Sequence, residues 1–188
     1  MIEKCDIVFL SGLMIMARFD GAECERFFRR CKEMGKVTVL DVAWNANGNW
    51  REVMGDCLRY VDYFLPSYDE ACEICGMTDV SEISRELISM GAKSVVVKMG
   101  EEGCFVLEGA DSVGYMVPAL TGIDVVDTTG AGDAFCSGFL YGLSEGFAIK
   151  EAARFGCATG AVCVTAFGAT SGMMSFDEIK IFMDERIG

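Results

Sequence analysis

Nine consecutive residues, Asp127 to Phe135, have the types and spacing that could do chemistry. They follow a short β-branched run, Ile123 to Val126, and open an apolar helical pattern, which predicts a strand, a glycine turn and a helix start. Gly130 and Gly132 allow backbone angles that a Cβ would forbid. The first free N–H groups of such a helix point at one spot, so the segment predicts an anion site.

Asp133 is the unusual member of this turn, because a carboxylate repels the phosphate that the turn would hold. A negative group beside an anion hole is useful if it must take a proton from an attacking hydroxyl. The combination favours phosphoryl transfer. A bare G-x-G-D is equally well explained as a glycine-rich turn with Asp133 capping the helix, since short glycine motifs often match by chance.

Length and charge exclude several classes of protein. A chain of 188 residues, 52% of them hydrophobic, suits a single α/β domain over residues 1–188. No segment has the roughly 18 uninterrupted apolar residues of a membrane span, and the first residues lack the layout of a signal peptide. The net charge of −13 argues against nucleic acid as a partner. We therefore expect a cytoplasmic protein with no membrane partner.

Cysteine and histidine counts narrow the chemistry further. Ten cysteines without a secretory signal indicate a reducing compartment. Cys72 and Cys75 form the single C-x-x-C, and without histidine or a second pair they are expected to be small helix residues, one packed inward, not zinc ligands. The absence of histidine excludes Ser-His-Asp and Cys-His catalysis. No Walker-type glycine loop is present, which disfavours a P-loop enzyme.

Apolar patterns alternate between strand and helix along the whole chain. Strands are expected at residues 6–10, 37–41, 63–65 and 94–98, and a hairpin at 103–107 with 112–117. Helices are expected at residues 22–34, 50–60, 69–75, 81–90, 133–143, 149–164 and 176–187. Strands spaced by helices predict an α/β fold with a mostly parallel, helix-covered sheet.

The nine-residue string resembles, at every position, the C-terminal signature of the ribokinase-like (PfkB-type) carbohydrate and nucleoside kinases. In that family the last Asp is the catalytic base for the sugar hydroxyl, and the Gly-Ala-Gly amides form the anion hole. The resemblance therefore implies Asp133 as the base. It implies that the anion hole is formed by Gly130, Ala131 and Gly132.

Two earlier segments extend the resemblance. Ser67 and Glu70 match the family's Asn-x-x-Glu motif, which organises the water shell of Mg²⁺ and phosphate, with serine in place of the usual asparagine. An ordinary capping box explains the same two residues, and both interpretations can hold together. Lys98, Gly100 and Gly103 match the family's Lys-x-Gly-x-x-Gly turn, which approaches the nucleotide, although alone they would indicate a turn between strands.

Residues 156–169 are similar to the family's adenine-side helix and the loop after it. Cys157 corresponds to a position that flanks the adenine. In potassium-activated members, carbonyls of the loop join the first Asp and second Thr of the signature around a monovalent cation. The corresponding residues here are Asp127, Thr129, Cys163, Ala166 and Gly168.

The resemblance implies a kinase that uses ATP and Mg²⁺, and K⁺ if the cation loop is functional, to phosphorylate a hydroxymethyl group of a sugar or sugar acid. The match begins partway into the family's fold, so we expect an N-terminally truncated ribokinase-like chain without the first sugar-side strands and lid. An exposed sheet edge near residues 7–10 would then favour homo-oligomers, poor solubility and no turnover. Two alternatives remain open: a non-catalytic adenine-nucleotide-binding fragment, and a subunit completed by a partner chain.

Overall fold

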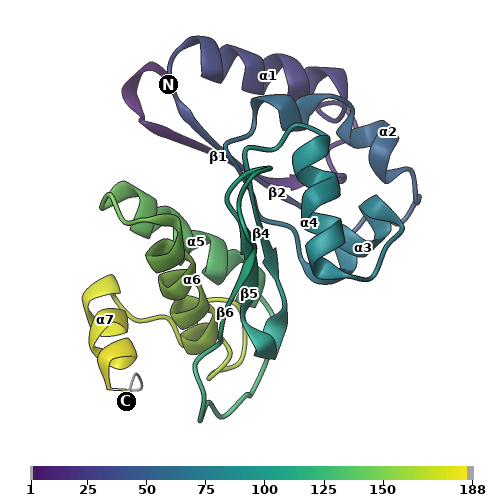
Figure 1. Cartoon of the computed structure of the whole chain (residues 1–188). Coiled ribbons are helices and arrows are strands. Elements are labelled where there is room, and N and C mark those ends of the chain that lie inside the picture. The colour runs from purple at the N-terminus through teal and green to yellow at the C-terminus, as the bar shows by residue number, and fades with distance from the viewer. Residues whose placement is uncertain (1, 186–188) are drawn as a thin grey trace. The chain divides into compact units, whose positions relative to one another are not determined.

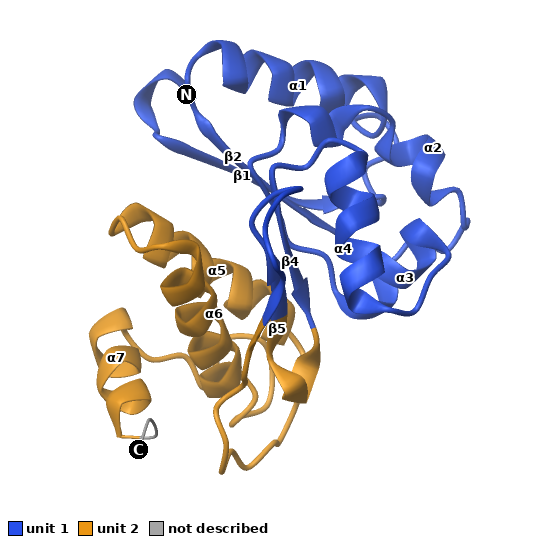
Figure 2. Ribbon diagram, viewed as in Figure 1, with its two compact units in different colours: residues 1–98, 105–115 blue, residues 99–104, 116–188 orange. Residues whose placement is uncertain are grey.

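The structure is a computed structural model that describes residues 2–185 (Figure 1). The chain divides into two compact units (Figure 2). Unit 1 comprises Met1–Lys98 and Phe105–Tyr115, and unit 2 comprises Met99–Cys104 and Met116–Gly188. Each unit is described by itself. The single domain expected over residues 1–188 stays a prediction.

The strands form one sheet in the order in which they occur along the chain. They are β1 (Ile7–Leu13), β2 (Val37–Val42), β3 (Tyr63–Phe64), β4 (Ser94–Lys98), β5 (Cys104–Leu107) and β6 (Tyr115–Val117). The first four strands pair in parallel, with Ile7 opposite Val37 and Tyr63 opposite both Val39 and Ser94. The predicted α/β class with a mostly parallel sheet is confirmed. So is the adjacency of the two strands predicted as a hairpin, β5 and β6.

Helices occupy the connections. Unit 1 contains α1 (Ala22–Glu33), α2 (Trp50–Met54), α3 (Tyr68–Cys75) and α4 (Val80–Ser89), with short 3₁₀ turns η1 (Ile2–Lys4) and η2 (Cys57–Tyr60). Unit 2 contains η3 (Gly100–Glu102), α5 (Ala131–Ser144), α6 (Ile149–Cys163) and α7 (Phe176–Asp184). Among the helices of residues 2–185, none combines the length and the apolar character that a bilayer span requires.

The predicted strand at Ile123 to Val126 is wrong: these residues form no regular element. Val125 and Val126 are exposed, and the backbone N–H of Val126 donates to the Val164 carbonyl, which lies in the loop after α6. β-branched residues favour a strand only where a neighbouring strand can pair with them.

Three other predicted boundaries are corrected. The strand predicted at 6–10 extends as β1 to Leu13, with a register shift after Leu10. The helix predicted at 50–60 ends at Met54, because the following Gly55 has a φ of 51°, and the chain continues as η2. Helix α7 ends at Asp184, and residues 186 and 187 of the predicted helix lie outside the described residues.

In unit 2, the backbones of α5 and α6 approach each other closely because glycines of α5 lie at their interface. A Cβ added to Gly138 would lie 2.8 Å from the Phe155 carbonyl oxygen, and one added to Gly142 would lie 2.8 Å from the Ala152 Cα. Either Cβ would collide with the facing helix, so glycine sets the spacing of the two helices.

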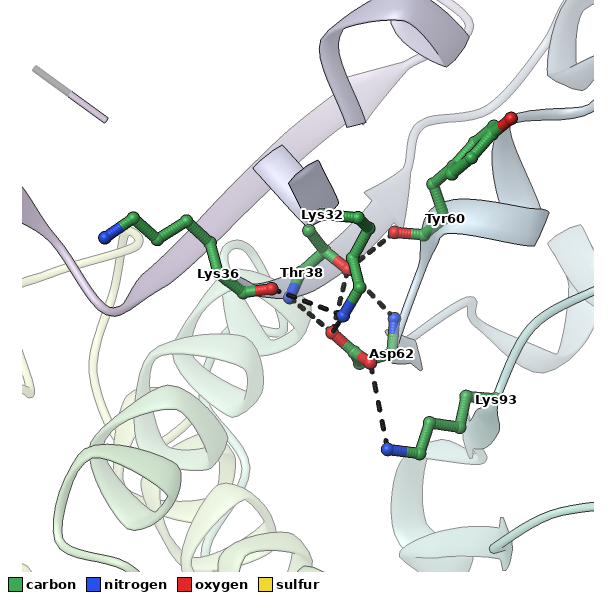
Figure 3. Close-up of polar contacts among 6 residues, drawn as sticks. All are labelled: Lys32, Lys36, Thr38, Tyr60, Asp62 and Lys93. Carbon is green, nitrogen blue, oxygen red and sulfur yellow. Dashed lines mark hydrogen bonds and ion pairs between the residues drawn. The ribbon is translucent and has the colours of Figure 1, made fainter. Parts of the chain in front are cut away.

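Asp62 ties together the amino-terminal ends of β2 and β3 in unit 1 (Figure 3). Its Oδ2 accepts hydrogen bonds from the Lys32 ammonium at 2.5 Å and from the Thr38 N–H at 2.9 Å. The Thr38 hydroxyl lies 2.6 Å from the Tyr60 carbonyl oxygen, and Lys93 Nζ lies 3.9 Å from Asp62 Oδ1. Although burial acts to raise the pKa of Asp62, its hydrogen bonds with Lys32 and Thr38 outweigh this effect and hold that pKa below its usual value.

We predict that Asp62→Asn lowers the free energy of unfolding by about 1–3 kcal/mol at pH 7, because it removes charge-assisted hydrogen bonds to a largely buried carboxylate. A depressed pKa stabilises the fold above the unfolded pKa of about 4, and this stabilisation is lost as the pH falls through the folded pKa. Urea unfolding at pH 7 and pH 3 measures both effects.

The matched control is Asp56→Asn, which breaks the exposed Asp56–Arg59 pair and should change the free energy by less than about 1 kcal/mol. Two outcomes would contradict this role of the Asp62 carboxylate. One is an equal loss of unfolding free energy in the two variants, and the other is a difference in unfolding free energy between wild type and Asp62→Asn that does not shrink at pH 3.

Candidate active site

The turn before α5 is built around the Asp127 carboxylate. Asp127 Oδ1 accepts from the Thr129 N–H at 2.9 Å and from the Thr129 hydroxyl at 2.8 Å, and Oδ2 accepts from the Gly168 N–H at 2.8 Å. These hydrogen bonds, foremost the one from the Thr129 N–H, lower the pKa of Asp127. The carboxylate therefore joins the signature to the loop after α6.

Gly130 is the N-cap of α5 and has a left-handed backbone, with φ 80° and ψ 0°. A Cβ at this position would lie 2.5 Å from the Ala169 Cβ and 2.8 Å from the Ala169 Cα. Both the backbone angle and the closeness of the loop after α6 therefore require glycine.

The start of α5 presents free backbone donors. The Ala131 N–H donates to the Thr128 carbonyl at 3.1 Å. Within residues 2–185 the N–H groups of Gly132 and Asp133 have no protein acceptor, as expected in the first turn of a helix. Of the residues implied in an anion hole, Ala131 therefore uses its N–H within the turn, whereas the Gly132 N–H stays unused in the part of the chain that the structure describes.

Asp133 occupies the third position of α5 and is exposed. No side chain caps α5, and no hydrogen bond or ion pair to the Asp133 carboxylate occurs in the part of the chain that the structure describes. The interpretation of Asp133 as a simple helix cap therefore finds no support in the geometry.

Four of the five residues implied in a cation site lie around the turn before α5. The Cys163 thiol lies 3.6 Å from the Thr129 carbonyl oxygen and 3.4 Å from the Ala169 carbonyl oxygen, and burial raises the pKa of that thiol. Asp127, Thr129, Cys163 and Gly168 are thus brought together. Ala166 lies close to Gly172, where an added Cβ would be 3.1 Å from the Ala166 Cβ.

Cys157 and Gly103 lie close to β6, within unit 2. Cys157 is buried, with its Sγ 3.9 Å from both the Cys104 Sγ and the Val117 carbonyl oxygen. This thiol contact, followed by burial, raises the pKa of Cys104. A Cβ on Gly103 would lie 2.5 Å from the Ala119 nitrogen, so glycine is needed for the backbone approach. Gly100, at the start of η3, has open space around it.

Ser67 and Glu70 form the predicted capping box in unit 1. The Ser67 hydroxyl accepts from the Glu70 N–H at 3.4 Å, and Glu70 Oε2 accepts from the Ser67 N–H at 2.7 Å. For Glu70 Oε1, no hydrogen bond exists within residues 2–185, and the side chain is partly exposed. A carboxylate with one unused oxygen fits a role in holding the waters of a magnesium ion. No cluster of three or more metal-binding side chains occurs among the described residues.

The sequence did not predict the ion pair that Lys98 forms. Its ammonium lies 2.8 Å from Asp41 Oδ1, and the two side chains are only 12% and 6% exposed. Burial raises the pKa of Asp41, an effect that Lys98 partly offsets and the charge of Glu70 adds to. The available signal was that both residues stand at the carboxyl ends of parallel strands, which meet at one edge of a sheet.

The predicted site residues therefore fall into two groups. Ser67, Glu70 and Lys98 belong to unit 1. The second group, in unit 2, contains Gly100, Gly103, Asp127, Thr129, Gly130, Ala131, Gly132, Asp133, Cys157, Cys163, Ala166 and Gly168.

We predict that Gly130→Ala lowers the free energy of unfolding by about 2–4 kcal/mol, because it adds overpacking against Ala169 to the cost of a left-handed alanine. Gly122→Ala is the matched control: Gly122 has φ 71° but no atom within 4 Å of an added Cβ, so about 1–2 kcal/mol is expected. Urea unfolding measures both. The second substitution in Gly130→Ala/Ala169→Gly should recover part of the loss, and no recovery would exclude the collision.

The chain resembles known proteins over almost its whole length. Residues 1–175 match the model of the pfkB family carbohydrate kinases. The chain is 30% identical over 189 residues to an ATP-dependent 6-phosphofructokinase of Thermoanaerobacterium thermosaccharolyticum, covering 98% of this chain and 58% of that protein. It is 40% identical over 173 residues to an uncharacterized sugar kinase of Archaeoglobus fulgidus, covering 90% of this chain and 65% of the relative.

A solved structure supports the fold. Aminoimidazole riboside kinase from Salmonella enterica, complexed with aminoimidazole riboside and an ATP analog, superimposes with a TM-score of 0.79 at 27% identity. The match covers 94% of this chain and 62% of that one, so this chain is shorter than the relatives it matches. On the match of residues 1–175, the chain belongs to the pfkB family of carbohydrate kinases.

Proposed function

We propose that this chain is the nucleotide-binding and catalytic-base part of an ATP-dependent sugar kinase. The reaction is transfer of the γ-phosphoryl group of ATP to a hydroxymethyl group of a sugar or sugar acid. The observation that carries the proposal is the exposed Asp133 carboxylate, which has no hydrogen-bond partner in the described residues and stands beside the free N–H groups of Gly132 and Asp133.

The chemistry assigned to α5 follows from its first turn. Asp133 takes the proton of the attacking hydroxyl as that oxygen approaches phosphorus. The amides of the glycine turn donate to the oxygens on which negative charge develops, and the helix dipole adds to this stabilisation. Because the transition state of phosphoryl transfer is loose, positioning and electrostatics are the main contributions expected of the protein.

The nucleotide side is assigned to the remaining predicted residues. The partly exposed Glu70 carboxylate would accept hydrogen bonds from the waters of a bound magnesium ion, which would supply neutralisation of phosphate charge. Ser67, Gly100, Gly103 and Cys157 are proposed to border the nucleotide. Lys98, whose ammonium is paired with Asp41, is proposed to act through its backbone and through the charge it neutralises.

A potassium ion is proposed for the loop joined to the signature by Asp127. The backbone and side-chain oxygens of the implied residues would hold it, and a cation there would stiffen the turn before α5 without touching the sugar. The implied residues are Asp127, Thr129, Cys163, Ala166 and Gly168.

The chain spans 58% and 65% of the lengths of the two curated relatives described above. This share favours a second candidate, a nucleotide-binding chain that turns over sugars only with additional sequence. Both candidates require nucleotide binding, and an ATP-consumption assay of the chain alone with a panel of sugars and sugar acids separates them.

We predict weak binding of ADP that requires Mg²⁺, because the phosphate donors of α5 and the Glu70 carboxylate both lie within this chain. Calorimetry at millimolar nucleotide measures it, and folded protein that gives no heat above dilution would exclude it. Potassium should tighten binding more than sodium at equal ionic strength. This difference should disappear in Asp127→Asn, which weakens the three hydrogen bonds that hold the loop.

In a form of the protein that turns over sugar, Asp133→Asn should lower kcat by about 10²–10⁴ and leave nucleotide binding nearly unchanged, because it removes a general base. Asp124→Asn, an exposed carboxylate of the same unit, is the matched control and should keep wild-type kcat. An Asp133→Asn rate above a tenth of wild type would mean that another group is the base. Glu70→Gln should instead raise the Mg²⁺ concentration required.

A further inference from the structure

Two backbone carbonyls lie within reach of one thiol beside the turn before α5. The Cys163 Sγ is 3.6 Å from the Thr129 carbonyl oxygen and 3.4 Å from the Ala169 carbonyl oxygen. No backbone N–H of the described residues donates to either carbonyl. The thiol is therefore a hydrogen-bond donor shared by two segments that are far apart in the chain, both of them in unit 2.

Cys163 is the last residue of α6 and is only 1% exposed. Burial, and after it the charges of Asp127 and Asp133, raises the pKa of this thiol, so the sulfur keeps its proton at neutral pH and can donate. A buried cysteine also behaves as a small apolar residue that fills space. The question is which of these two properties the turn before α5 uses.

Two further contacts join the same segments. The Gly168 N–H donates to Asp127 Oδ2 at 2.8 Å. Gly130 approaches Ala169 so closely that an added Cβ would lie 2.5 Å from the Ala169 Cβ. Thr129 stands between Asp127 and Gly130 in the chain, so the thiol acts on the middle of a turn that contacts the loop after α6 on both sides.

We propose that Cys163 is a positioning residue for the phosphate-binding turn: its thiol donates alternately to the carbonyls of Thr129 and Ala169 and so holds the loop after α6 against the start of α5. The inference rests on the proposed function, in which the first free N–H groups of α5 receive phosphate. The competing explanation is that the sulfur only fills space. The two explanations differ over substitutions that separate hydrogen-bond donation from size.

The deciding variants are Cys163→Ser, which keeps a donor on a smaller side chain, and Cys163→Val, which keeps the bulk without a donor. The first readout needs no ligand: exchange of the Gly168 amide followed by NMR. Exchange should be about fivefold faster in Cys163→Val, which corresponds to one lost hydrogen bond of about 1 kcal/mol, and within about twofold of wild type in Cys163→Ser. A sulfur that only fills space predicts the reverse order.

The second readout is calorimetric titration of ADP with Mg²⁺, in one potassium buffer for all variants. The affinity should fall about fivefold in Cys163→Val and stay within about twofold of wild type in Cys163→Ser, because a turn that is open part of the time binds only for the remaining fraction. If Cys163→Val does not fold, Cys163→Ala replaces it, since alanine is close to serine in size and has no donor.

Thr159→Ala is the matched control on the same helix. It removes a buried hydroxyl that donates to the Phe155 carbonyl at 2.8 Å, away from the turn. We expect a lower free energy of unfolding with wild-type ADP affinity. A loss of affinity in this variant equal to that of Cys163→Val would show that general destabilisation explains both, and would overturn the inference.

The remaining outcomes separate the inference from the proposed function. A wild-type chain that binds no nucleotide would overturn the proposed function and, with it, the role of the thiol toward phosphate. If the wild type binds, near-normal behaviour of Cys163→Val with impairment of Cys163→Ser would overturn the inference alone. So would faster Gly168 exchange without a change in affinity, because the thiol would then stabilise the loop without positioning the turn.

Discussion

Three hydrogen bonds to the Asp127 carboxylate are the interaction on which the candidate site in unit 2 depends. Two of them shape the turn locally, and the third reaches Gly168, in the loop after α6. The loop continues to Ala169, which approaches Gly130 so closely that only glycine fits. Contacts with the loop after α6 therefore set the direction of the first turn of α5, and with it the position of Asp133.

Unit 1 uses charge differently at the two ends of its parallel strands. At the amino ends, Asp62 is satisfied by backbone, hydroxyl and ammonium donors, and the arrangement serves stability. At the carboxyl ends, Asp41 and Lys98 are buried more deeply, while Glu70 keeps one oxygen without a protein partner among the described residues. Groups with unused hydrogen-bonding capacity thus lie at the edge where parallel α/β sheets bind ligands.

The sequence predicted correctly those features that depend only on residues close together in the chain. Ser67 and Glu70, three positions apart, are sufficient to specify the capping box of α3, and the glycines of the signature specify the turn before α5. The strand expected at Ile123 to Val126 failed because its residues do not determine whether a partner strand is available. The Asp41–Lys98 pair joins residues 57 positions apart, so it depends on strand order, which composition and periodicity do not reveal.

The backbone contact between α5 and α6 limits how this sequence can vary. Gly138 and Gly142 face α6 with no room for one additional methyl group, so even alanine would push the helices apart. Gly138 lies about 7.5 Å along the helix axis from Asp133, at a rise of about 1.5 Å per residue. Because the helix is stiff, a displacement at that point would also move its first turn. Substitution of these buried glycines is therefore limited by the need to keep Asp133 in place.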